Sequence, residues 1–423
     1  MRLALLLALI AWAGTVAWNA IKPLPAGTHV ASLSTRLLES QLEVIEDTGG
    51  ARNILARELA LIDRADQMIV LDQAPLLRET GQHLLLRKRE RPNVRIVVLA
   101  DPLPEVYGGT PAHYLDSLER AGIVVVRTRL DRLRDPLPWY TALWRVGIGW
   151  WSDPYDETAP RAGFLASLRR ANFKADRRQL LVADDGAGSW IGMLPAVAGG
   201  QLAVAVAGGA ARDMASSELK IAAWSAEDDR LPGAPPPAGL AVGSIDARFL
   251  TEGAIRGALV DAFAAAGSGD EIGLSTPLLS DRAVVEAALH AAGRGARIRL
   301  LLDREAAPNR AVAEELEHAG GESVEVRWLP AGQARSSLAI VRHHRELWVS
   351  VGAVDFSRLT LDDLDLSSAL ELRLQANAPA ARRFNDAFEA QWSGSAADPP
   401  SADSIAPGYW RYRALQSAGL AAY

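Results

Sequence analysis

The sequence reads VRIVVLAD at 94–101 and ARIRLLLD at 296–303, two apolar runs that each end in aspartate. Short apolar runs of this kind are typical of buried strands. The final aspartates lie 202 residues apart (303 − 101), and Pro75 and Pro277, which close two earlier apolar runs, have the same separation (277 − 75). The sequence therefore predicts a structural unit that occurs twice in the chain.

The elements around these runs follow the same order in both halves. A helical face and a strand precede each run, at 54–62 and 68–71 and again at 255–265 and 271–276. Strands that no helix separates close each half, at 179–183, 190–194 and 202–207, and at 338–341, 347–351 and 369–375. Strands that alternate with helices favour a mostly parallel sheet covered on both faces. We predict an α/β fold of two lobes, each a mixed β-sheet flanked by helices, related by pseudo-two-fold symmetry.

A Pro- and Gly-rich stretch divides the two copies. Residues 226–240 read AEDDRLPGAPPPAGL, which cannot form a helix or a central strand and is typical of a linker. The predicted domains are a membrane anchor or signal at 1–25, lobe 1 at 45–225, the linker at 226–240, lobe 2 at 241–393 and a C-terminal tail at 394–423. A ligand cleft is expected where the two lobes meet.

Composition excludes several classes of protein. Of the 423 residues, 49% are apolar and 23% are charged, which are the values of a packed globular chain. The net charge of −6 argues against a dedicated nucleic-acid binder, which needs a basic surface. Cysteine is absent, so disulfide scaffolds, cysteine-ligated zinc sites and thiolate nucleophiles are excluded.

The N-terminal segment is apolar enough for a membrane. Residues 3–18 carry no charge, and Arg2 and Lys22 flank them. A cleaved signal is one interpretation, but the single charge before the segment and the indoles of Trp12 and Trp18 favour an uncleaved transmembrane anchor. We predict a single-pass protein of the cell membrane with the bulk of the chain on the outer, periplasmic or extracytoplasmic side.

Several stretches resemble the phospholipase D superfamily, in particular a membrane-anchored bacterial branch. They are NFKADRRQLLVADDG at 172–186, DEIGLSTPLL at 270–279, SLAIVRHHRELWVSVGAVDFSRLTL at 337–361 and ALELRL at 369–374. The resemblance covers roughly 53–392. It implies the motif His-x-Lys-(x)4-Asp once per lobe, in which one His attacks phosphorus, the other protonates the leaving oxygen, and the Lys residues neutralise the phosphoryl oxygens.

Both motifs are degenerate in this chain. The first falls on Arg177, Gln179 and Asp184, and the second falls on Arg335, Ser337 and Arg342. None of the seven histidines is followed two residues later by lysine, so the motif is absent rather than displaced. The resemblance also places Asp355 where the family carries Asn, and it matches Glu371 to a carboxylate that the family often has. We expect no catalytic residue at these positions, no metal site and no cofactor.

Arginine at both histidine positions suggests two interpretations. Arginine stays charged, cannot act as a base and binds phosphate through two parallel hydrogen bonds, so Arg177, Arg335 and Glu371 are candidate ligand-binding residues for a phosphate group. In the second interpretation, each arginine pairs with a nearby carboxylate such as Asp184, Glu371 or Asp355 and fills the space of the lost histidine.

Residues 126–178 form a locally basic insertion in an acidic chain. Its aromatic residues include Trp139 and Tyr140, interleaved with arginines such as Arg129, Arg132 and Arg134. Basic and aromatic residues together suit contact with an anionic bilayer surface, and a packed loop is the alternative.

The predicted function is therefore that of a membrane-anchored phospholipase D-like pseudoenzyme that binds phosphate groups or anionic lipid. One alternative is an active phosphodiesterase or phosphatidyltransferase of the phospholipase D or cardiolipin-synthase type. Another is a scaffold that uses both lobes for protein contacts.

Overall fold

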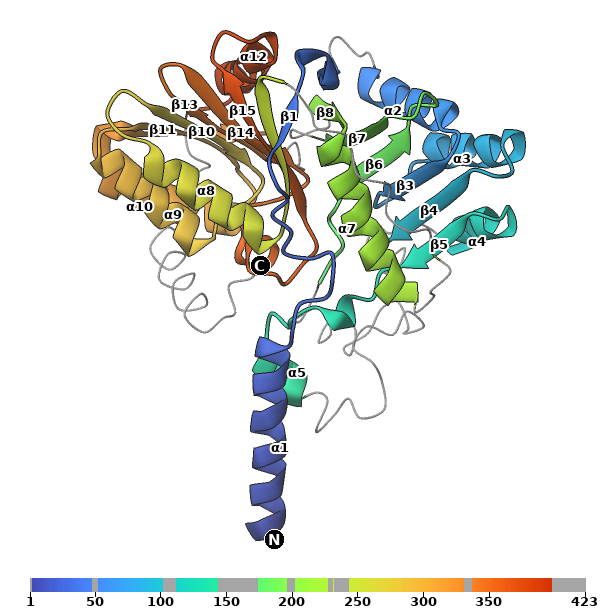
Figure 1. Cartoon of the computed structure of the whole chain (residues 1–423). Helices are drawn as coiled ribbons and strands as arrows, with labels where there is room; N and C mark the ends of the chain where they lie inside the picture. The colour runs from blue at the N-terminus through green and yellow to red at the C-terminus, as the bar shows by residue number, and fades with distance from the viewer. Residues whose placement is uncertain are drawn as a thin grey trace.

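The computed structural model describes residues 2–47, 52–101, 112–143, 174–195, 202–226, 231, 243–330 and 337–397. Two β-sheets with their helices form two lobes that lie side by side, and the N-terminal helix extends away from them (Figure 1). The α/β class and the two mixed sheets confirm the fold that the sequence predicts.

Lobe 1 contains a seven-stranded sheet in the order β2-β8-β7-β6-β3-β4-β5. Strands β3, β4 and β5 are parallel, and the other neighbours are antiparallel. The strands are β2 (Leu42–Glu46), β3 (Met68–Asp72), β4 (Arg95–Ala100), β5 (Val124–Arg127), β6 (Leu180–Asp184), β7 (Trp190–Pro195) and β8 (Leu202–Ala207). The helices are α2 (Asn53–Arg64), α3 (Arg78–Glu90), α4 (Ala112–Arg120), α5 (Pro138–Leu143) and α7 (Gly209–Ala226), with 3-10 turns η1 (Glu39–Gln41) and η3 (Leu130–Arg132).

Lobe 2 contains an eight-stranded sheet in the order β1-β9-β15-β14-β13-β10-β11-β12. The strands are β1 (Thr35–Leu37), β9 (Ile245–Thr251), β10 (Glu271–Thr276), β11 (Arg297–Asp303), β12 (Val324–Leu329), β13 (Ser337–Arg342), β14 (Glu346–Gly352) and β15 (Ser368–Gln375). The helices are α8 (Gly253–Ala265), α9 (Arg282–Gly293), α10 (Ala307–Gly320), α11 (Arg358–Leu361) and α12 (Pro379–Gly394), with the 3-10 turn η6 (Gly321–Ser323).

The two sheets repeat the same strand order and the same register. Strand β3 pairs with β6 so that Asp72 lies opposite Leu180, and β10 pairs with β13 so that Ser275 lies opposite Leu338. The start of β6 in lobe 1 is therefore equivalent to the start of β13 in lobe 2. Gln179 and Ser337, at the two lysine positions of the degenerate motif, occupy equivalent places.

Strand β1 belongs to the sheet of lobe 2 although it precedes lobe 1 in the chain. It pairs antiparallel with β9, and Leu37 lies opposite Ile245. Leu37 is 1% exposed and joins a single apolar core that contains side chains of both lobes, Phe249 and Val204 among them. Since apolar burial is the main favourable term in folding, this shared core joins the lobes into one body.

Helix α1 (Arg2–Ile21) is long and apolar enough to cross a membrane, and it is the only such helix in the part of the chain that the structure describes. Most of its side chains are exposed, and it extends away from the lobes (Figure 1). These properties agree with the predicted membrane anchor.

Candidate functional site

Gln179 and Ser337, which the sequence resemblance aligns with the motif lysines, have hydrogen-bond partners inside their own lobes. Gln179 donates from Nε2 to the carbonyl oxygen of Ala74 at 3.3 Å. Ser337 is buried, and its Oγ lies 2.5 Å from the carbonyl oxygen of Val354 and 2.8 Å from Oγ1 of Thr276. Neither position supplies an ammonium group that could stabilise a phosphoryl oxygen.

Asp184 and Arg342, which the resemblance aligns with the motif aspartates, form hydrogen bonds and ion pairs at the ends of β6 and β13. Asp184 is buried and accepts backbone N–H groups from Asp66, Gln67 and Met68 at 2.8–2.9 Å, which fixes the turn before β3. Arg342, at the equivalent place in lobe 2, pairs with Glu271 and with Glu389. The aspartate that the chain keeps therefore has a structural role.

Arg177 joins the two lobes. Its Nε donates to Asp365 at 2.9 Å and its Nη1 donates to Asp355 at 3.2 Å, while its backbone N–H donates to Leu366. Burial alone would lower the pKa of Arg177, but the two carboxylates outweigh it and raise that pKa. The guanidinium at the histidine position is thus a permanent cation between two carboxylates of lobe 2.

Glu371, a second candidate ligand-binding residue, has its partners elsewhere in lobe 2. Glu371 is buried in the sheet of lobe 2, where Arg248 donates to its Oε2 and Trp348 donates to its Oε1. Arg335 lies outside the described residues. The predicted phosphate site therefore rests on Arg177 alone among the described candidates, and the phosphate-binding role of all three residues stays a prediction.

Arg178, which the sequence analysis did not single out, is the most completely bonded side chain between the lobes. It is fully buried and donates to Glu218 at 2.9 Å on α7 and to Glu252 at 2.6 Å in lobe 2. It also donates to Ser217 and to the carbonyl oxygen of Gly27 in the segment that follows α1. One guanidinium thus connects three parts of the molecule.

Two further carboxyl groups lie beside this guanidinium, and we call Arg178, Glu218, Glu252, Asp72 and Asp176 the Arg178 cluster. Burial raises the pKa of Asp72 well above its usual value, and neighbouring Asp176 and Glu218 raise it further. Burial and the charge of Glu218 likewise raise the pKa of Asp176 to about 7. Burial and the neighbouring carboxylates therefore favour the protonated forms of Asp72 and Asp176.

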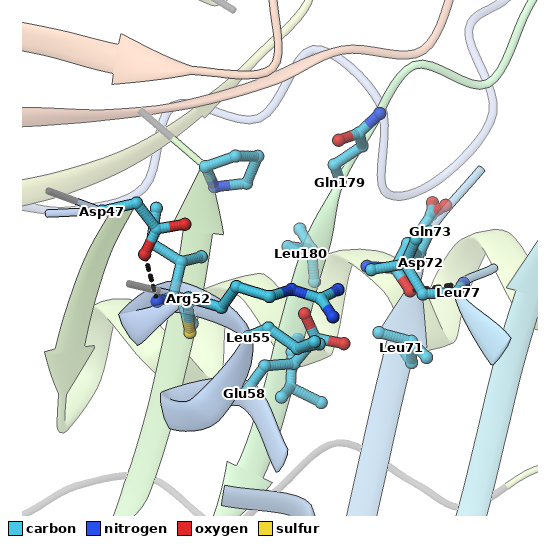
Figure 2. Close-up of a pocket in the computed structure, with 14 residues that line it drawn as sticks. Asp47, Arg52, Leu55, Glu58, Leu71, Asp72, Gln73, Leu77, Gln179 and Leu180 are labelled. Carbon is cyan, nitrogen blue, oxygen red and sulfur yellow. Dashed lines mark hydrogen bonds between the residues drawn. The ribbon is translucent and has the colours of Figure 1, made fainter. Parts of the chain in front are cut away.

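A cavity of about 330 Å³ lies in lobe 1, beside the start of β6. Figure 2 shows Arg52 reaching into it, with Glu58, Asp72 and Gln179 around it. Burial raises the pKa of Glu58, whose Oε1 accepts from Thr80, and Arg52 pairs with Glu79. None of the described residues that line the cavity is histidine or lysine, so this set of side chains does not suit phosphoryl transfer.

One histidine lies near the Arg178 cluster. His29 Nδ1 is 2.7 Å from Asp363, and the backbone N–H of His29 donates to Glu252. Half of the His29 side chain is exposed. His29 is not one of the positions to which the sequence resemblance assigns a motif histidine.

The described residues contain no group of three His, Cys, Asp or Glu side chains that could hold a metal ion. Between the lobes, the described side chains form ion pairs that join lobe 1 to lobe 2, namely Arg177 with Asp355 and Asp365, and Arg178 with Glu252.

Comparison with solved structures finds similar folds. A phosphatidylserine synthase from Haemophilus influenzae matches with a TM-score of 0.59 and 10% identity, over 98% of this chain and 99% of that chain. A polyphosphate kinase from Porphyromonas gingivalis matches with a TM-score of 0.51 and 13% identity, over 95% of this chain and 57% of that chain. Nuc, a phospholipase D family member from Salmonella typhimurium, matches 37% of this chain with a TM-score of 0.29.

No protein-family model and no curated protein matches the sequence. The structural likenesses concern the fold, and they confirm the predicted two-lobed phospholipase D-like architecture.

Proposed function

We propose that this chain is a membrane-anchored protein of phospholipase D-like fold that has no phosphodiester chemistry and acts as a non-catalytic, two-lobed body at the membrane. One observation carries the proposal. Arg177 stands where the family motif places histidine, and it donates to Asp355 and Asp365 at 3.2 and 2.9 Å.

These contacts account for two differences from the family motif, arginine in place of histidine at 177 and aspartate in place of asparagine at 355. Asp355 stands where the family carries an amide, so a permanent cation and a carboxylate replace two neutral partners across the lobe boundary. A guanidinium beside carboxylates stays protonated and cannot accept a proton from water or attack phosphorus. The arrangement therefore favours the interpretation in which the arginine fills the space of the lost histidine.

The same contacts disfavour a phosphate ligand at Arg177. A phosphate bound to Arg177 would lie close to two carboxylates, Asp365 and Asp355, which already accept two of the five guanidinium hydrogens. The negative charges of a phosphate and of two neighbouring carboxylates repel one another strongly in a partly buried site. Anionic-lipid contact through residues 126–178 stays part of the proposal, although Arg127 and Arg129 pair with Glu119 and Asp131.

The first test is a sensitive phosphodiesterase and phosphatidyltransferase assay on the full chain in lipid vesicles that contain phosphatidylglycerol. The unmodified protein is expected to give no turnover above buffer. A control variant, His29→Ala, is expected to give the same baseline. Turnover by the unmodified protein that His29→Ala abolishes, or a trapped phosphohistidine, would establish the active-enzyme alternative.

A second test addresses the ligand. Millimolar phosphate or vanadate is expected to leave the melting temperature of the full chain unchanged, because a ligand stabilises only the state that binds it. A rise in melting temperature that disappears in Arg177→Gln would support the phosphate site that the sequence predicts and would contradict the proposal that Arg177 is only a structural cation.

A further inference from the structure

Helix α1 is just long enough to cross the hydrocarbon core of a bilayer. Its 20 residues span about 30 Å at 1.5 Å per residue, which equals the usual hydrocarbon thickness. Almost all of α1 must then lie within the membrane. Any element that packs beside its C-terminal half lies within the membrane as well.

Helix α5 packs there. Figure 1 shows α5 beside the upper part of α1, at the end nearer the lobes. The indole Nε1 of Trp12 donates to the carbonyl oxygen of Trp139 on α5 at 3.3 Å, and Trp12 lies near the middle of α1. The covered side chains of α1 form one helical stripe, namely Trp12, Thr15, Val16 and Asn19.

The outer face of α5 is apolar and uncovered. Thr141 and Ala142 are buried, whereas Trp139 is 41% exposed and Leu143 is 48% exposed. Large apolar side chains on a short helix beside a membrane span are typical of segments that enter the bilayer interface.

Polar contacts mark the level at which the membrane ends. Lys22, just beyond α1, donates from Nζ to the carbonyl oxygen of Asp131, and Arg134 donates from Nε to the carbonyl oxygen of Lys22. The backbone N–H of Asp135 donates to Asn19 at the last turn of α1. Lys22 and Asp135 are buried at this end of α1, so these contacts attach α1 to lobe 1 beside the level at which the membrane would end.

We propose that α5 is a second membrane-inserted element, which enters the bilayer beside α1 and places Trp139 and Leu143 against lipid acyl chains. The proposal rests on the membrane-spanning role of α1. It differs from electrostatic contact with an anionic surface, because α5 buries apolar area and does so with or without anionic lipid. The inserted pair fixes the height and the orientation of the lobes above the membrane.

The absence of cysteine makes a depth measurement direct. Three single variants of the full chain, Leu9→Cys, Leu86→Cys and Leu143→Cys, carry an environment-sensitive nitrobenzoxadiazole label in vesicles of phosphatidylcholine, with and without phosphatidylglycerol. All three side chains are about half exposed, so labelling does not disturb the core. Leu9 on α1 is the lipid reference, and Leu86 on α3 is the water reference.

The Leu143→Cys label is expected to show the blue-shifted emission and the quenching by doxyl-labelled lipid that the Leu9→Cys label shows, in both vesicle compositions. If the Leu9→Cys label reports lipid while the Leu143→Cys label matches Leu86→Cys, α5 lies in water and the inference is wrong, although the anchor stands. If the Leu9→Cys label also reports water, the anchor itself is wrong and the inference fails with it. If the Leu143→Cys label contacts lipid only in vesicles that contain phosphatidylglycerol, the contact is electrostatic and the proposed apolar insertion is wrong.

Discussion

At the scale of single residues, adjacent arginines at the start of β6 have different surroundings. Arg177 is 38% exposed and donates to Asp355 and Asp365. Arg178 is fully buried and donates to Glu218 and Glu252. Removal of one partner of a buried ion pair leaves the other charge without compensation, and this cost falls steeply with exposure.

Arg178→Met is therefore expected to lower the free energy of unfolding by about 3–5 kcal/mol, because Glu218 and Glu252 lose their cation inside the protein. The control, Arg36→Met, is expected to cost less than about 1 kcal/mol, because both partners of its ion pair with Asp246 are exposed to water. Denaturant unfolding of the full chain in detergent micelles measures both. Equal losses in the two variants would contradict a central role of Arg178.

At the scale of elements, β1 is the clearest example of a segment that pairs with a strand far away in the sequence. Its three residues lie before lobe 1 in the chain but extend the sheet of lobe 2. Leu37 is 1% exposed, whereas the next residue, Leu38, is 51% exposed. Leu37 is the last residue of β1 and belongs to the shared core, whereas Leu38 begins the turn that follows and does not.

Leu37→Ala is expected to lower the free energy of unfolding by about 2–4 kcal/mol through lost burial and the cavity that remains. Leu38→Ala removes the same atoms from an exposed position and is expected to change it by less than about 0.5 kcal/mol. Thermal unfolding followed by circular dichroism compares them. If Leu37→Ala were as mild as Leu38→Ala, β1 would not be joined to the core.

At the scale of the whole molecule, the Arg178 cluster makes stability depend on pH. The pKa of Asp72 is raised well above 3.8, and that of Asp176 is raised from 3.8 to about 7, in both cases first by burial. The folded protein therefore holds more protons than the unfolded chain between about pH 4 and 7. The free energy of unfolding then falls as the pH rises through this window.

Asp72→Asn is expected to flatten that fall, because an amide of the same shape cannot lose a proton. Melting temperatures of the full chain are measured from pH 5 to pH 8 for the unmodified protein and for the variant, and the difference between the two curves isolates Asp72 from other titrating groups. The variant is expected to gain relative stability as the pH rises. A constant difference across the range would show that Asp72 does not retain a proton in the folded protein.

Local patterns in the sequence determined much of this protein. Apolar runs and their order predicted the central strands of both sheets, the repeated unit and the apolar N-terminal helix, because the pattern of buried residues is a property of each segment. They did not predict β1, β2 or β9, which lie at the edge where the lobes meet or next to it. The search for a histidine followed two residues later by lysine needed no structure, since it is a property of the chain alone. The same patterns missed α7, whose buried face is largely alanine, a residue with a weak hydrophobic signal.

Only the tertiary structure decided which side chains meet. Arg177 and Asp365 are separated by 188 residues, and Trp12 and Trp139 are separated by 127. No local pattern encodes such pairs. Burial of the shared core brings these segments together, and the packing then determines which charged side chains become neighbours. Packing likewise joined β1 to lobe 2 and set α5 beside α1.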